Sequence, residues 1–194
     1  MTATIYFLVR VEESYNNFVD LGNGVKLSKN NSIDDVESIN RVGKIIGAPK
    51  GTVAVEGDYI LFHHNICRQA WGFKGKKRVS NYAITDKEFF VPVAEVFMYM
   101  KEDTEKWQAV APFVFIKPIP AEKITLSNGL QVEEESYKGF KPLVGEVAYS
   151  NKQLEKEGVE EGDTIAFQQD SEHEYKLKGE IYYKMKNQDI LAIL

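Results

Sequence analysis

Glu56-Gly57-Asp58-Tyr59-Ile60-Leu61-Phe62 and Glu161-Gly162-Asp163-Thr164-Ile165-Ala166-Phe167 are two versions of one stretch, separated by 105 residues. Val42-Gly43-Lys44-Ile45 precedes the first, and Val144-Gly145-Glu146-Val147 precedes the second at a shift of 102. Self-similarity at a fixed period is the mark of a repeated structural unit. Because the period is close to the size of a small domain, the sequence predicts two copies of one domain in tandem.

A third match lies upstream of each pair. Asn23-Gly24 is followed by Val25-Lys26-Leu27, and Asn128-Gly129 is followed by Leu130-Gln131-Val132. The shift is again 105 residues. Each triplet has two apolar outer residues, which share one face of an extended segment, around a polar middle residue.

Composition limits the function classes. The chain has 194 residues and a net charge of -5, divided as -1 over residues 1–105 and -4 over residues 106–194. Neither half has the basic excess of a protein that binds a phosphate backbone. The single cysteine, Cys67, excludes an internal disulfide and a multi-cysteine zinc site. No apolar run is long enough for a membrane span and no secretory signal is evident, so we expect a cytoplasmic protein that does not bind membranes or nucleic acid.

Short apolar and β-branched runs separated by turn signals predict an all-β fold of two small barrels or sandwiches. We expect domain 1 over residues 1–101 with an additional exposed loop at 68–79, a linker at 102–111, and domain 2 over residues 112–194. Residues 151–158 are charged and could form a helical turn. The expected strands are Ile5–Val11, Val42–Ile46, Tyr59–His63, Asn81–Thr85, Phe89–Val91, Val93–Met100, Phe113–Lys117, Val144–Tyr149, Thr164–Gln168, Lys176–Leu177, Ile181–Tyr183 and Ile190–Leu194.

These landmarks resemble GroES-type co-chaperonins, the chaperonin-10 family. Gly158 to Phe167 is similar to the family's Gly-Asp turn and following apolar strand, and Met185 to Ile193 is similar to its last strand. Val144 to Val147 matches the strand after the family's mobile loop, and Phe113 to Lys117 matches its first strand. The first copy is more divergent, with Glu95-Val96-Phe97-Met98 standing where Asp189-Ile190-Leu191-Ala192 stands in the second.

The resemblance implies two tandem GroES-like small β-barrel domains, which assemble into a ring. That ring would cap a GroEL-type chaperonin in its nucleotide-bound state and assist protein folding, without being an enzyme and without a cofactor or metal of its own. It also implies a short roof hairpin over Ile46–Glu56 and a polar replacement for it over Ser150–Glu161. The implied mobile loops carry Gly24, Val25, Lys26, Leu27, Gly129, Leu130, Gln131 and Val132. The implied ring interface uses Ile5, Phe7, Val9, Ile190, Leu191 and Ile193.

Other interpretations stay open at this point. Asn-Gly is a strong hairpin signal, so each triplet could simply begin a short strand. The chain could instead be a nucleic-acid- or protein-binding module built on two small barrels, or an enzyme on a GroES-like fold, although the dinucleotide domain and metal ligands of such an enzyme are missing. His63 and His64, if both lie on a strand, point to opposite faces and do not form a metal site. Cys67 is expected to be a small buried thiol.

Overall fold

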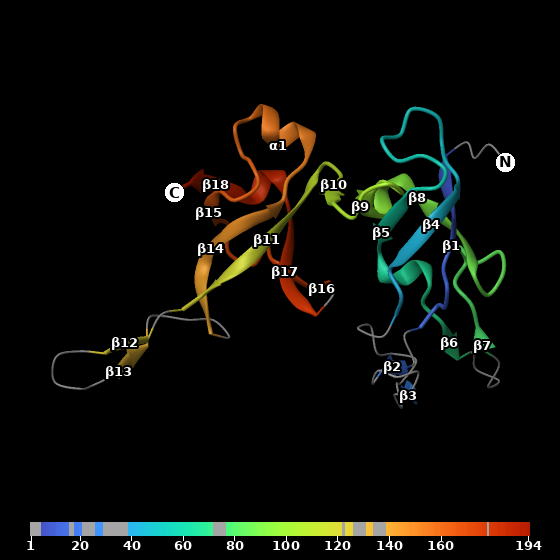
Figure 1. The fold of residues 1–194 in the computed structure, drawn as a ribbon, viewed down its shortest axis with the longest axis horizontal. Helices are drawn as coiled ribbons and strands as arrows, with labels where there is room; N and C mark the ends of the chain where they lie inside the picture. The colour runs from blue at the N-terminus through green and yellow to red at the C-terminus, as the bar shows by residue number, and fades with distance from the viewer. Residues whose placement is uncertain are drawn as a thin grey trace. The chain divides into compact units, whose positions relative to one another are not determined.

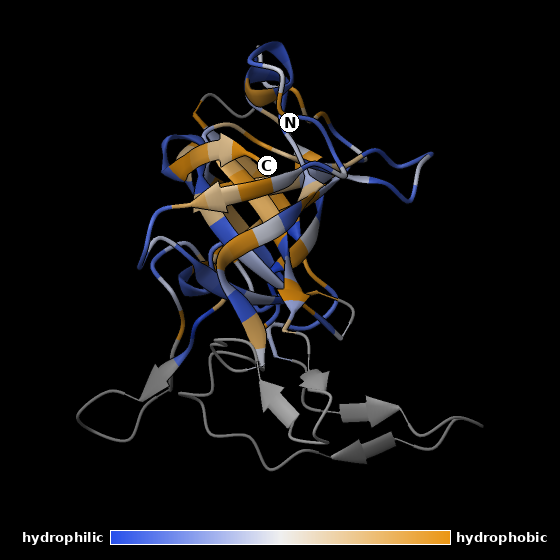
Figure 2. Cartoon of the chain, turned by 90° about the vertical axis from the view of Figure 1, so that its left-hand side faces the viewer, coloured by the Kyte–Doolittle hydropathy of each residue, from blue (hydrophilic) through white to orange (hydrophobic). Residues whose placement is uncertain are grey.

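A computed structural model describes residues 5–15, 18–20, 26–28, 39–71, 77–121, 123–125, 131–133, 139–177 and 179–194. The chain divides into two compact units, Met1–Trp107 (unit 1) and Gln108–Leu194 (unit 2). Among the described residues, the regular secondary structure of both units consists almost entirely of strands, and many of the hydrophobic segments in Figure 2 lie on strands (Figures 1 and 2). Among the described residues, no helix has the length and apolar character needed to cross a bilayer.

Unit 1 contains an antiparallel sheet in which five strands follow the order β9-β5-β4-β1-β8. Its sixth strand is β10, which spans the point where the chain passes from unit 1 to unit 2. The elements are β1 (Tyr6–Arg10), β2 (Phe18–Asp20), β3 (Lys26–Ser28), β4 (Val42–Gly47), β5 (Tyr59–Phe62), the 3₁₀ helix η2 (His64–Ile66), β6 (Ala70–Trp71), β7 (Lys77–Arg78), β8 (Glu88–Pro92), the 3₁₀ helix η3 (Val93–Glu95), β9 (Val96–Met100) and β10 (Trp107–Ala109).

Unit 2 contains a six-stranded antiparallel sheet with the order β16-β17-β11-β14-β15-β18. The elements are β11 (Phe113–Pro120), β12 (Lys123–Thr125), β13 (Gln131–Glu133), β14 (Phe140–Tyr149), α1 (Lys152–Lys156), β15 (Thr164–Phe167), β16 (His173–Leu177), β17 (Glu180–Lys186), the 3₁₀ helix η4 (Asn187–Asp189) and β18 (Ile190–Ile193).

The two sheets share one strand order. Read from the last strand of each unit, β9-β5-β4-β1-β8 corresponds to β18-β15-β14-β11-β17. The prediction of an all-β fold with almost no helix is therefore confirmed. Burial alternates along β4 and β15, as expected for a sheet with one buried face, whereas β1, β5, β9 and β11 each contain at least three consecutive buried residues. The core of unit 1 includes Phe7, Val9, Ile45, Ile60, Phe62, Phe89, Val91 and Met98, and that of unit 2 includes Val114, Ile116, Val147, Leu154, Ile165, Phe167, Tyr183 and Met185.

The structure differs from the predicted strands in two places. Asn81–Thr85 is not a strand, because only Ala83 pairs with β8, through an isolated bridge to Phe89. The predicted strand Val93–Met100 begins with the 3₁₀ helix η3, whose N-cap is Pro92, and only Val96–Met100 is extended. Pro92 is the last residue of β8, and because proline lacks a backbone N–H it does not continue the ladder beyond that point.

The interval after the Val-Gly strand takes a different form in each unit. In unit 1 it is a turn that reaches Gly51, a residue with φ of 82°. In unit 2 it is α1, as the charged stretch 151–158 predicted. The Asn151 side chain caps α1 by accepting hydrogen bonds from the backbone N–H groups of Gln153 (3.0 Å) and Leu154 (3.1 Å). Leu154 then anchors this short helix in the core.

Candidate functional site

The two triplets singled out in the sequence lie at equivalent hairpins. In unit 1, β2 pairs antiparallel with β3. In unit 2, β12 pairs antiparallel with β13. Both hairpins consist of two three-residue strands separated by a five-residue interval, and every boundary is shifted by 105 residues. The Asn-Gly pairs fall in the intervals 21–25 and 126–130, which lie outside the described residues.

The stem that carries each hairpin is closed by main-chain pairing. In unit 1, Tyr15 forms an antiparallel bridge with Ile39, and both residues are buried. In unit 2, β11 and β14 meet at the pair Pro120 and Phe140. A further hydrogen bond of 2.9 Å runs beyond that pair, from the backbone N–H of Ala121 to the carbonyl of Gly139. Each hairpin thus lies in the connection between two equivalent paired strands. It follows β1 and precedes β4 in unit 1, and it follows β11 and precedes β14 in unit 2.

The structure describes only the second and third residues of each triplet. Lys26 and Leu27 begin β3, and Gln131 and Val132 begin β13. The hairpin interpretation left open by the Asn-Gly signal therefore applies to these four residues. Gly24, Val25, Gly129 and Leu130 lie outside the described residues.

The two hairpins pair residues of the same kind at equivalent positions. Leu27 stands opposite Val19, and Val132 stands opposite Ile124, so each third triplet residue has an apolar cross-strand partner. The polar middle residues stand opposite polar residues, Lys26 opposite Asp20 and Gln131 opposite Thr125. The departure from an all-apolar triplet is thus matched across the hairpin in both copies.

The Val-Gly landmarks hold the strand that follows each hairpin. A methyl group on Gly43 would overlap the Cγ1 atom of Val9, and one on Gly145 would overlap the Cγ2 atom of Ile116. The main-chain oxygens of Arg10 and Lys117 lie 3.1 and 3.0 Å from these positions. Glycine is therefore required in both units, because a core side chain of the neighbouring strand crosses the backbone there.

The Glu-Gly-Asp landmarks form the same turn in both units. Gly57 and Gly162 have φ values of 98° and 94°, which strongly favour glycine. The backbone N–H groups of Gly57 and Gly162 donate to the carbonyls of Ile45 (2.9 Å) and Val147 (2.8 Å), which belong to the Val-Gly strands. The repeated motif is therefore a device that joins two neighbouring strands of the sheet.

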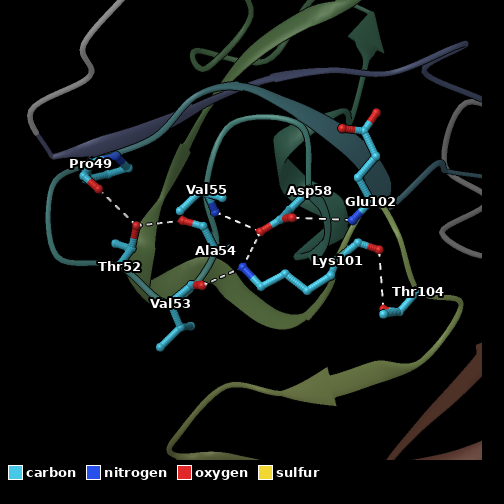
Figure 3. A network of polar contacts seen from close by, with 9 residues as sticks. All are labelled: Pro49, Thr52, Val53, Ala54, Val55, Asp58, Lys101, Glu102 and Thr104. Atoms are coloured by element: carbon cyan, nitrogen blue, oxygen red, sulfur yellow. Dashed lines mark hydrogen bonds and ion pairs between the residues drawn. The ribbon is translucent and has the colours of Figure 1, made fainter.

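Asp58 is the centre of a polar network in unit 1 (Figure 3). It is only 4% exposed, and its Oδ2 atom accepts hydrogen bonds from the Val55 N–H (2.9 Å) and the Lys101 ammonium (2.7 Å). The same ammonium donates to the Val53 carbonyl at 3.1 Å. Burial alone would raise the pKa of Asp58, but the hydrogen bonds from Lys101 and Val55 outweigh it and lower that pKa. Sequence reasoning missed this network; the only signal for it is a lysine directly after the last strand of the first copy.

Other predicted residues are placed as follows. The Cys67 thiol is buried, and burial raises its pKa to about 12. The expectation that His63 and His64 point to opposite faces is wrong, because β5 ends at Phe62 and His63 caps η2. Their rings stack instead, with centroids 4.2 Å apart. No cluster of potential metal ligands occurs among the described residues.

The residues of the expected ring interface fall into two groups. Phe7 and Val9 are core residues of unit 1, and β1 lies between β4 and β8 with both of its edges paired. Ile5 is 64% exposed, and Leu191 and Ile193 are also exposed. Ile190 is half-buried, and its strand β18 is the edge of the unit 2 sheet. In the first copy the additional loop contains the short hairpin β6–β7, with 72–76 outside the described residues.

Comparison with known families gives a match for the second unit. Residues 113–194 match the family model of the chaperonin 10 Kd subunit. The match begins at the first residue of β11 and includes the β12–β13 hairpin, the Gly145 contact and the Gly162 turn. The match supports a GroES-type domain in the C-terminal part of the chain and fits a small β-barrel fold. No curated protein matches the chain.

Proposed function

We propose that the chain is a tandem co-chaperonin, in which two GroES-type domains on one polypeptide form a ring lid on a GroEL-type chaperonin. The observation that carries this proposal is the hairpin that recurs in both units, with the same lengths, stem position and polar pattern. The chaperonin-10 match to residues 113–194 supports a chaperonin partner in general. The shared strand order supports extending the assignment to unit 1.

In this proposal the docking elements are the two triplets, Val25-Lys26-Leu27 and Leu130-Gln131-Val132. Each provides two apolar anchors, and burying one such side chain is worth roughly 1.5–3 kcal/mol. Ordering each loop residue costs about 1–2 kcal/mol, so a single triplet binds only marginally. Several triplets on one ring bind tightly together, because each bound loop raises the effective concentration of the next. Weak single contacts and strong combined binding give a lid that closes the chaperonin and can still dissociate from it.

The ring itself would join the exposed edge of β18 to the start of β1 in the next copy. Leu191 and Ile193 at that edge and Ile5 before β1 are the exposed apolar residues of this contact. An unpaired apolar strand edge otherwise favours aggregation. Phe7 and Val9 would act indirectly, by fixing β1 in the core. A head-to-tail contact of this kind gives a ring when the rotation between neighbouring copies closes, which this proposal requires.

The lid would act without catalysis and without its own nucleotide site, in the cytoplasm, and the nucleotide dependence would come from the chaperonin. Analytical ultracentrifugation of the chain with a GroEL-type chaperonin, with and without ADP or ATP, tests this role. We expect nucleotide-dependent co-sedimentation, reduced by Val25→Ser with Leu27→Ser or by Leu130→Ser with Val132→Ser. The comparison of the two double variants shows which unit carries more of the binding.

The matched control is Val53→Ser with Val55→Ser, because these valines are exposed and also two residues apart but lie outside the hairpins. Co-sedimentation that is absent with every nucleotide, or lost equally in the control, would contradict the proposed function. For the ring, Leu191→Ser with Ile193→Ser should lower the sedimentation coefficient of the chain alone. An unchanged sedimentation coefficient would show that β18 is not part of the interface.

A further inference from the structure

Unit 2 has an open cavity of about 340 Å³, lined by residues of β17 and of the segments 168–173 and 188–189. Its lining includes Phe113, Lys184 and Lys186, together with His173 and three glutamine side chains. Cavities of this size hold small molecules. The cavity lies outside the hairpins and the ring edge, so an inference from it does not depend on the proposed function.

The basic side chains of the cavity are brought together by the strand register. Lys184 and Lys186 are two residues apart on β17 and lie on the same face of the sheet. His173 on β16 stands directly opposite Lys184. The Lys184 ammonium lies 4.9 Å from the centre of the Phe113 ring, a cation–π contact that holds its half-buried chain at the wall of the cavity.

Two acidic residues, Asp170 and Asp189, also line the cavity, so its formal charge is balanced and an anion would be held by direct contacts with the ammonium groups rather than by a net positive charge. The Oδ2 atom of Asp189 accepts a hydrogen bond from the Lys186 backbone N–H at 2.9 Å, so this carboxylate serves as a local cap of η4. Asp170 is exposed at the rim, in a turn where its φ is 62°. Gln168, Gln169 and Gln188 also line the cavity, and glutamine side chains can donate hydrogen bonds.

Unit 1 shows that the fold does not require these lysines. Val9 and Ile116 cross equivalent glycines, so Leu8 corresponds to Phe115. Leu8 pairs with Phe90, and Phe115 pairs with Lys184. By the same register, Pro92 of unit 1 stands where Lys186 stands in unit 2. The same backbone positions thus carry an apolar surface in one unit and two ammonium groups in the other.

We propose that this cavity binds an oxyanion, a phosphate or carboxylate group of a small molecule, held mainly by Lys184 and Lys186. Charge-assisted hydrogen bonds from ammonium groups to such anions are among the stronger polar contacts. The aromatic wall and the glutamine amides leave room for the part of the molecule that bears the anion. Phosphate and carboxylate share this chemistry, and separate titrations distinguish them.

The test is a titration of the full chain with inorganic phosphate, and separately with acetate, at constant ionic strength, followed by backbone amide chemical shifts. We expect saturable shifts confined to residues 168–173 and 184–189 with one or both anions. Lys184→Met with Lys186→Met should weaken binding about tenfold or more. Lys184→Arg with Lys186→Arg should retain it.

Lys152→Met with Lys156→Met is the matched control, because it removes the same charge from exposed positions of α1, outside the cavity. If the double methionine variant does not fold, Lys186→Met alone serves, since Lys186 is exposed. Saturation by phosphate only would assign the site to phosphate groups. No saturable binding of either anion, or equal weakening in the Lys152 and Lys156 control, would overturn the proposal.

Discussion

The Glu-Gly-Asp turn is anchored differently in the two units. In unit 1, the buried Asp58 is held by Lys101, which comes from the end of β9, 43 residues further along the chain. In unit 2, the Asp163 carboxylate accepts a local hydrogen bond from the Glu160 N–H at 2.8 Å, and no long-range partner of this carboxylate occurs among the described residues. There, support for the preceding segment comes from the buried Asn151, whose side chain donates to the Phe113 carbonyl at 2.7 Å. One backbone motif is therefore stabilised by a long-range ion pair in one copy and by a capped helix in the other.

The largest effect should come from removing the two aspartates. Asp58→Ala should lower the free energy of unfolding of unit 1 by about 2–3 kcal/mol, because it breaks a mostly buried ion pair whose lysine still reaches water. Asp163→Ala should cost unit 2 only about 1 kcal/mol, the value of one hydrogen bond. Native-state hydrogen exchange measures the free energy of unfolding of both units in one molecule, so each unit is the control for the other. Equal losses in the two variants would refute the difference in anchoring.

The second pair of variants should show no such asymmetry. Gly43→Ala and Gly145→Ala each place a methyl group against a core side chain, of Val9 or Ile116. Overpacking of this kind costs about 1–3 kcal/mol. We expect similar losses, measured by hydrogen exchange in the unit that carries each substitution. A loss in only one unit would mean that the Val-Gly strands are not equivalent.

The turn glycines should give a smaller effect. Gly57→Ala and Gly162→Ala force alanine into a left-handed conformation, at a cost of about 1–2 kcal/mol. In unit 1 the new methyl group would also approach the Glu102 carboxylate (2.6 Å), whereas in unit 2 it would meet open space. Because Glu102 is exposed and pairs with Lys44, its displacement should add less than about 1 kcal/mol. Chemical denaturation of each variant measures both values, and a neutral result in both would contradict the strained turn.

The smallest effect should be a pH dependence specific to unit 1. The pKa of Asp58 is lower in the folded state than its ordinary value of about 3.9, so its charge stabilises the folded state above that pH. This stabilisation is lost as the pH falls through the folded-state pKa. The stability difference between the wild type and Asp58→Asn should therefore shrink in acid, by on the order of 1 kcal/mol between pH 5 and 2. A difference that is constant over this range would show that the charge of Asp58 does not matter.

The sequence predicted the features that depend on neighbouring residues. The repeated Gly-Asp turns, the strands that flank them and the helical turn after Asn151 all have local causes in glycine conformation, apolar alternation and capping. The Lys101–Asp58 pair could not be predicted, because long-range pairing depends on strand order rather than on local pattern. The stacking of His63 and His64 was also missed. The predicted strand ran to His63, whereas β5 ends at Phe62 and the 3₁₀ helix η2 begins at His64.

For the candidate site, the repeated Asn-Gly motif predicted the position of the triplets but left two structures open for them. In the hairpin register, the polar middle residues Lys26 and Gln131 stand opposite the polar residues Asp20 and Thr125. The unit 2 cavity could not be predicted either, because its lysines alternate along β17 as solvent-exposed residues of any strand do. Only the comparison with Phe90 and Pro92 in unit 1 distinguishes them.

The buried thiol of Cys67 makes the chain convenient for site-specific labelling. Cys67 is the only cysteine, and with a pKa of about 12 only about one molecule in 10⁵ carries its thiolate at neutral pH. A maleimide or nitroxide reagent should therefore leave the native cysteine unmodified. A cysteine placed at position 24 or 129 would be the only reactive thiol, so fluorescence or spin-label spectra could report on each hairpin separately without prior removal of Cys67.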